Sequence, residues 1–90
     1  MTGWTVELTK AAQRQFRNLE SGPRQAAAEL IADLAEDPSI VPSIELRGKP
    51  HIRRARFHHD RYRMIYLIAR AGKRIIVKRI RPRPTAYEGI

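Results

Sequence analysis

The residues best suited to chemistry lie in a basic run, His51-Ile52-Arg53-Arg54-Ala55-Arg56-Phe57-His58. If this run is a β-strand, alternate side chains share a face, so Arg54, Arg56 and His58 point one way and Arg53 points the other. A row of arginines cannot be buried in an apolar core, so it must meet solvent, phosphate or an acidic partner. Guanidinium groups bind phosphate through a bidentate fork, and the run therefore predicts a phosphate-binding surface.

Other arginines can join this face if the strands that carry them are neighbours. Arg63 lies on the next predicted strand, and Arg79 and Arg81 lie on the last one. The alternative is a solvated charged surface, but such surfaces normally mix the two signs of charge, and acidic residues are scarce here. We therefore predict a concave, arginine-lined sheet face opposite the helices. The predicted nucleic-acid-binding residues are Arg53, Arg54, Lys49, Arg79 and Arg83.

The aromatic and histidine residues are weaker candidates. Tyr87 follows a basic, proline-rich tail, where an exposed ring suits base stacking; the alternative is that it pins the tail to the body. His58 or His51 could act as a general acid or base, because histidine titrates near neutral pH. We expect no metal and no cofactor: the segment His58-His59-Asp60 lies in a predicted turn without a second ligand cluster.

Charge is concentrated in the second half of the chain. Residues 1–44 carry four basic and six acidic side chains, whereas residues 45–90 carry fourteen basic and three acidic ones. This bias predicts a nucleic-acid partner. Cysteine is absent, which excludes disulfides, and no apolar run approaches the roughly 18 residues of a spanning helix. We expect one cytoplasmic domain, residues 1–90, with no membrane partner.

The elements that must position these residues follow from hydrophobic spacing. Residues 4–8 alternate as a strand with Trp4, Val6 and Leu8 inward, and Thr9 is placed to cap a helix over residues 10–20. A second helix is predicted to begin with Pro23 at its first position and to end at residue 36.

From residue 44 the apolar period becomes two. Four strands are predicted, at residues 44–46, 51–57, 62–68 and 75–81, with Tyr62 and Tyr66 in the core. Pro82 and Pro84 are expected to hold the tail extended. The predicted fold is α+β, with the order β-α-α-β-β-β, an extra short strand, and an antiparallel sheet with a two-helix hairpin on one face.

These features resemble the RelE/ParE superfamily of toxins from type II toxin–antitoxin systems, and the RelE branch best. The resemblance covers nearly the whole chain. It rests on Leu46-Arg47-Gly48-Lys49-Pro50, on Tyr62-Arg63-Met64-Ile65-Tyr66, and on Arg81 followed six residues later by Tyr87.

The resemblance implies a ribosome-dependent mRNA endonuclease that is inhibited by a RelB-like antitoxin. In such enzymes the ribose 2′-OH attacks the adjacent phosphate. Carried onto this sequence, Arg63 would neutralise the phosphate, Arg54 would hold the message, and Arg56 would sit near the 2′-OH. Arg81 would sit near the leaving 5′-oxygen, and Tyr87 would stack on a base.

The chain departs from that pattern at the positions of Arg54 and Arg56, where lysines are usual. Arginine stays protonated and hardly serves as a base. Either Arg56 acts only through its charge, or His58 takes the proton. Two other functions stay open: a ParE-like toxin that poisons DNA gyrase without catalysis, and a degenerate toxin that only binds RNA.

Overall fold

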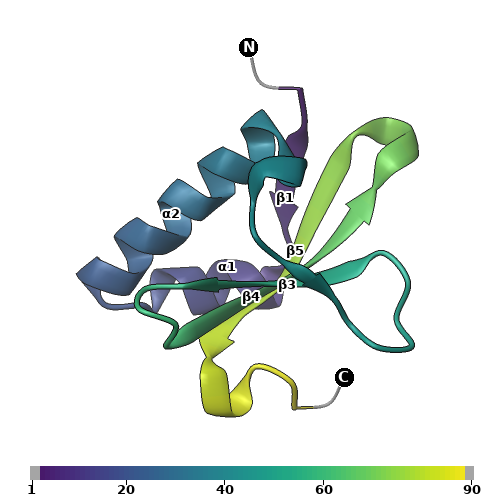
Figure 1. The fold of residues 1–90 in the computed structure, drawn as a ribbon. Helices are drawn as coiled ribbons and strands as arrows, with labels where there is room; N and C mark the ends of the chain where they lie inside the picture. Colours follow the sequence, from purple (N-terminus) through teal and green to yellow (C-terminus); the bar gives the residue numbers. More distant parts are fainter. Residues whose placement is uncertain (1–2, 89–90) are drawn as a thin grey trace.

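A five-stranded sheet forms the centre of the fold, with the strand order β1-β5-β4-β3-β2 (Figure 1). This computed structural model describes residues 3–88. The strands are β1 (Thr5–Leu8), β2 (Ile44–Glu45), β3 (Ile52–Phe57), β4 (Tyr62–Ala69) and β5 (Arg74–Pro82). The predicted α+β fold is confirmed, including the extra short strand.

One strand pair departs from the predicted antiparallel sheet. Strands β2 to β5 pair antiparallel in order along the chain, whereas β1 pairs parallel with β5 at one edge. Hydrophobic alternation gives the face that a side chain occupies, but it gives neither the partner nor the direction of a strand. The parallel pair brings the start of the chain next to its last strand.

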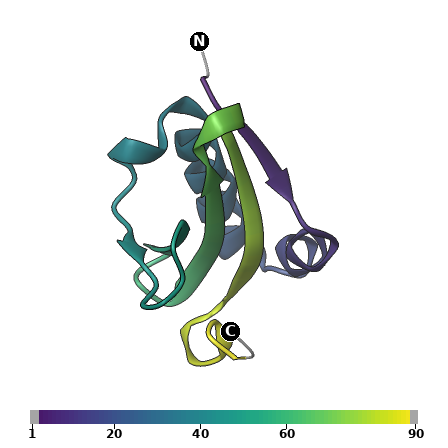
Figure 2. The same cartoon turned by 90° about the vertical axis from the view of Figure 1, so that its right-hand side faces the viewer.

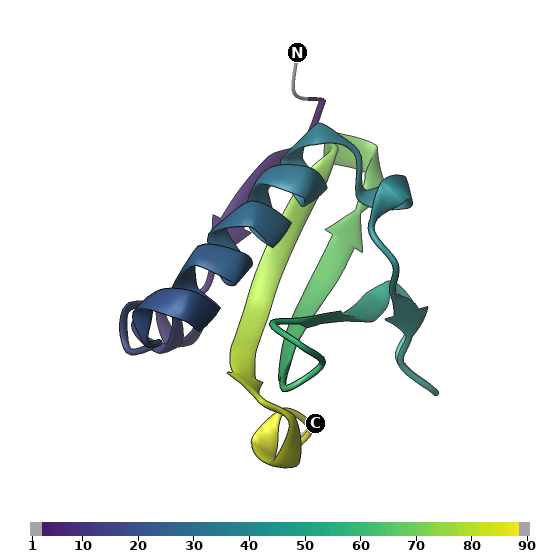
Figure 3. The same ribbon diagram turned by 60° about the vertical axis from the view of Figure 1, so that its left-hand side comes forward.

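Two helices pack on the apolar face of the sheet, α1 (Lys10–Arg17) and α2 (Ser21–Glu36). Figure 3 shows α2 lying across that face. Thr9 caps α1 as predicted, since its side chain accepts a hydrogen bond of 3.1 Å from the Ala12 N–H. Neither helix is long and apolar enough to cross a membrane, within residues 3–88.

The predicted start of α2 is wrong by two residues. The helix begins at Ser21 rather than at Pro23. Proline is tolerated anywhere in the first turn, because the N–H groups there have no partner inside the helix. Pro23 therefore marks the first turn but not the first residue.

The core lies between the helices and the sheet. Its largest fully buried side chains on the sheet include Tyr66, Met64 and Ile75, and Leu34 meets them from α2. Tyr62 packs against this core, as do the predicted inward residues of β1, namely Trp4, Val6 and Leu8. The predicted core faces of β1 and β4 are therefore confirmed.

A β-bulge interrupts the pairing of β4 with β5. Ile65 pairs with Arg79 but Tyr66 pairs with Val77, which leaves Lys78 as an extra residue on β5. Ile75 and Val77 point into the core, and after the bulge Ile80 does so. A bulge shifts the alternation of the residues that follow it, so Arg79 and Arg81 point away from the core.

The tail is folded and not extended, contrary to prediction. It curls at the end of β5 (Figure 2), where Arg83–Thr85 form one 3-10 turn. The fixed φ of proline suits the first turn of a helix as well as an extended chain, and Pro84 takes the helical option. Ala86 is fully buried, and Arg79 donates a hydrogen bond of 3.1 Å to its carbonyl oxygen.

Candidate nucleic-acid interface

Three arginines lie side by side across the middle of the sheet. Arg56 of β3 is the direct cross-strand partner of Arg63 on β4, and Arg63 is the direct partner of Arg81 on β5. Their neighbours in sequence point into the core, so the three point to the opposite face. Neighbouring strands are about 4.8 Å apart, and like charges at directly opposed positions destabilise a sheet. We call Arg56, Arg63 and Arg81 the arginine row.

A second set of cross-strand partners lies beside the arginine row. Arg54 pairs with Ile65, and Ile65 pairs with Arg79. Arg54 is only 8% exposed, and its buried Nε has no hydrogen-bond partner in the described chain. The Nε of Arg63 is also buried and also has no hydrogen-bond partner in the described chain. A buried donor without an acceptor costs free energy, so both arginines are held on this face at a cost in stability.

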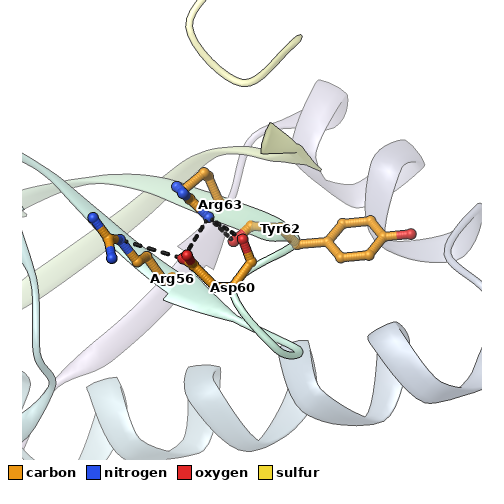
Figure 4. Close-up of polar contacts among 4 residues, drawn as sticks. All are labelled: Arg56, Asp60, Tyr62 and Arg63. Atoms are coloured by element: carbon orange, nitrogen blue, oxygen red, sulfur yellow. Dashed lines mark hydrogen bonds and ion pairs between the residues drawn. The ribbon is translucent and has the colours of Figure 1, made fainter. Parts of the chain in front are cut away.

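The carboxylate of Asp60, in the turn between β3 and β4, contacts two arginines of the row. Its Oδ1 lies 3.0 Å from Arg63 Nη1 and 3.3 Å from Arg56 Nε (Figure 4). The same Nη1 donates to the carbonyl oxygens of Asp60, at 2.8 Å, and Tyr62, at 3.2 Å. Sequence reasoning missed Asp60. The available signal is that it is the only acidic residue between Glu45 and Glu88.

A groove of about 450 Å³ runs beside the arginine row. Thr9, Ala11 and Gln15 line it from the start of α1, and Lys49 and Ile52 line it from the other side. Its remaining lining residues come from the centre of the sheet and are Ile65, Lys78, Arg79 and Arg81. The groove brings Lys49, Arg79 and Arg81 together, as predicted for one basic surface.

Two predicted site residues lie elsewhere. Arg53 points to the helix side of β3 and donates to the Oγ of Ser43, at 2.7 Å, and to its carbonyl oxygen, at 3.0 Å. It therefore anchors a loop and does not share the arginine face. The alternation of side chains along the strand had already placed Arg53 on the other face from Arg54.

The expectation that His58 shares the face of Arg56 is wrong. Strand β3 ends at Phe57, and His58 has a φ of 52°, which takes it out of the strand alternation. Its ring lies 5.9 Å from that of Tyr62, and a Cβ on Gly22 would meet its Cε1 at 3.2 Å. His58 thus packs beside the first turn of α2.

The tail leaves its aromatic side chain free for contact. Tyr87 is 43% exposed, and buried Ala86 rather than Tyr87 holds the tail against the body. Arg83 is exposed in the tail, and Arg81 Nη2 lies 3.9 Å from the carboxylate of Glu88. The exposed Tyr87 therefore lies six residues after Arg81 and four residues after Arg83 in the sequence.

Comparisons with known proteins agree on a family and a fold. Residues 6–87 match the model of a family described as the ParE toxin of the type II toxin–antitoxin system parDE. No curated protein matches the chain in a sequence search.

Solved structures with the same fold are toxins, alone or with antitoxins. The isolated E. coli RelE toxin superposes with a TM-score of 0.78 at 20% identity, over 89% of this chain and 84% of that chain. The RelBE2 toxin–antitoxin complex from Mycobacterium tuberculosis gives 0.76 at 27% identity, over 89% and 98%. The archaeal RelE–RelB complex from Pyrococcus horikoshii OT3 gives 0.74 at 24%, over 96% and 100%.

Proposed function

The chain belongs to the ParE toxin family, within the RelE/ParE superfamily of type II toxin–antitoxin systems, and from this premise we propose that it is a ribosome-dependent mRNA endoribonuclease. The observation that carries the proposal is the arginine row. Three cations at directly opposed positions cost stability, and a polyanionic ligand offsets that cost. An RNA backbone is such a ligand.

In the proposed reaction the ribose 2′-oxygen attacks the adjacent phosphorus as the bond from phosphorus to the 5′-oxygen breaks. The products are a 2′,3′-cyclic phosphate and a free 5′-OH. Arg63, at the centre of the row, neutralises the charge that grows on the phosphate. Arg56 on one side lies near the attacking oxygen, and Arg81 on the other meets the leaving oxygen. Arg54 holds the adjoining backbone.

The remaining basic and aromatic residues bind the message around this centre. Lys49 and Arg79 line the groove beside the row. Arg83, which is exposed, extends the basic surface along the tail. Tyr87, exposed at the end of the tail, stacks on a base and helps to align the attack. Arg53 is not part of this surface, because it points to the helix side of β3, where it donates to Ser43.

We further propose that a RelB-like antitoxin inhibits the toxin. The RelBE2 and archaeal RelE–RelB structures that share this fold are complexes of a toxin with its antitoxin. An acidic or amphipathic antitoxin segment would complement the basic sheet face electrostatically. Binding there would cover the arginine row and stop cleavage.

A ParE-like function, the poisoning of DNA gyrase without catalysis, is the second candidate. The observation in its favour is that the matching family model is that of ParE toxins. Under this function the arginine row would bind a partner, and no bond would be cleaved.

The test compares three variants with the wild-type chain in a translation system. Primer extension on the translated message reports cleavage, and supercoiling by gyrase is assayed in parallel. Removal of one donor to a transition-state oxyanion typically costs about 100-fold to 1000-fold in rate, which is the loss expected for Arg63→Ala. Arg81→Ala should also abolish most cleavage. Arg70→Ala, in the distant β4–β5 turn, removes the same charge and should cleave normally.

Full cleavage by both Arg63→Ala and Arg81→Ala would show that the site is wrong. Blocked supercoiling without any cleavage by the wild-type chain would replace the nuclease with the gyrase function. Thermal unfolding of each variant checks that a loss of cleavage is not a loss of fold.

A further inference from the structure

The turn between β3 and β4 has an unfavourable backbone that separates two candidate proton acceptors. His58, His59 and Asp60 have φ values of 52°, 57° and 64°, all in the left-handed region that favours glycine. Strained backbone of this kind is often found at functional sites. Here the turn directs His58 toward Gly22 on α2 and Asp60 toward the arginine row.

The Asp60 carboxylate can leave its contacts with Arg56 and Arg63 without displacing Arg63. Arg63 Nη1 carries two N–H groups, and two backbone carbonyl oxygens within 3.2 Å can accept both. Arg63 therefore stays in place when the carboxylate leaves. The Asp60 side chain is 49% exposed and that of Arg56 is 57% exposed, so this ion pair is weak and open to exchange.

We propose that Asp60 is the general base of the cleavage reaction, an inference that rests on the proposed function. A phosphodiester that enters the arginine row takes over the contacts to Arg56 and Arg63. The displaced carboxylate remains beside the phosphate, because the turn holds it there. A carboxylate that loses contacts with cations accepts a proton more readily, so substrate binding itself activates the base.

The step balances without another reactant. Asp60 takes the proton of the 2′-OH as the 2′-oxygen bonds to phosphorus and the bond to the 5′-oxygen breaks. Arg81 meets the charge on the leaving oxygen, which then takes a proton from water. Arg56 and Arg63 hold the phosphate throughout.

Two other groups are less well placed for the same role. His58 lies beside α2, away from the arginine row. Glu88 lies 3.9 Å from Arg81 at the other end of the row, and its side chain is 66% exposed. Among described residues, Asp60 is the carboxylate that contacts both Arg56 and Arg63.

The experiment measures single-turnover cleavage in programmed ribosomes, together with RNA binding. In Asp60→Asn the size of the side chain is kept, and asparagine tolerates a positive φ. General bases contribute about 100-fold to 10,000-fold, so its cleavage should fall by at least about 100-fold. Its binding to a single-stranded RNA oligomer should be as tight as that of the wild type or tighter. His58→Gln and Glu88→Gln should keep wild-type cleavage.

A rescue experiment separates a base from a structural residue. Asp60→Gly also fits the positive φ and leaves room for an added carboxylate, so formate should restore part of its rate.

Wild-type cleavage by Asp60→Asn would overturn the inference while the proposed nuclease stands. If His58→Gln lost cleavage at the same time, the proton would be assigned to His58. A wild-type chain that cleaves nothing would refute the nuclease itself, and the general base with it.

Discussion

At the scale of single residues, two adjacent arginines of β3 have opposite surroundings. Arg53 is satisfied by two hydrogen bonds to Ser43. Arg54 is buried, and its Nε has no partner in the described chain. A buried donor without an acceptor costs free energy, so Arg54 lowers stability in exchange for a positively charged face.

This contrast predicts opposite effects of the same substitution. An unsatisfied buried donor costs about 1–3 kcal/mol, so Arg54→Met should raise the free energy of unfolding by up to that amount. It should also weaken RNA binding. Arg53→Met loses two hydrogen bonds worth about 1 kcal/mol each and should lower the free energy of unfolding. Urea unfolding measures both, and a destabilised Arg54→Met would contradict the account.

At the scale of elements, the sequence predicts those features that follow from hydrophobic alternation in a strand or from a helix-capping residue. The strand faces of β3 and β4, the Thr9 cap and the core tyrosines follow from local patterns, and the structure confirms them. Three features could not be found in this way: the left-handed turn, the bulge at Lys78 and the folded tail. Each is set by tertiary contacts that override local preference.

The arginine row required more than alternation. A strict period of two places Arg79 and Arg81 on the same face as Ile75 and Val77, which is the core face. The prediction that they join Arg63 is correct only because the bulge intervenes. Asp60 was missed because a turn between two strands has no fixed face.

The parallel pair of β1 with β5 gives a pH-dependent contribution to stability. Glu7 accepts hydrogen bonds of 2.7 and 3.2 Å from Arg74. This hydrogen bonding, aided by the charge of Arg74, lowers the pKa of Glu7 below its ordinary value of 4.5. The folded pKa lies below the unfolded one, so the contribution is present above the unfolded pKa and is lost as pH falls through the folded pKa.

Glu7→Gln should therefore be less stable than the wild type at neutral pH. The difference should shrink in acid and vanish once Glu7 is protonated in the folded state. Urea midpoints of both proteins over a pH series give the measurement. Glu29→Gln, on the exposed side of α2, removes the same charge as a control. A difference that persists unchanged in acid would show that the Glu7–Arg74 pair is not its source.

At the scale of the whole molecule, the two halves of the chain differ both in net charge and in the elements that they form. The half of the chain with four basic and six acidic residues supplies β1 and both helices, and the half with fourteen and three supplies β3 to β5. The helical half closes one face of the sheet, so the arginines gather on the other. The resulting polarity orients the molecule toward a polyanion before any contact forms.

RNA affinity should depend steeply on salt for this reason. Seven cations are proposed to bind the message, namely Lys49, Arg54, Arg56, Arg63, Arg79, Arg81 and Arg83. Single strands give about −0.7 per phosphate contact, so log K against log salt should have a slope of about −4.9 if each makes one contact. Fluorescence anisotropy of a labelled oligomer over a salt series measures it. A slope near zero would contradict binding through the arginine face.

The bulge at Lys78 makes the site depend on the length of a strand as well as on its composition. With the added residue the last arginines of β5 point away from the core, and without it they would point into the core. A deletion of a single codon in β5 would thus remove the site without altering any residue that forms it. When relatives are aligned, a gap at this position says more about activity than the presence of Arg79 and Arg81 does.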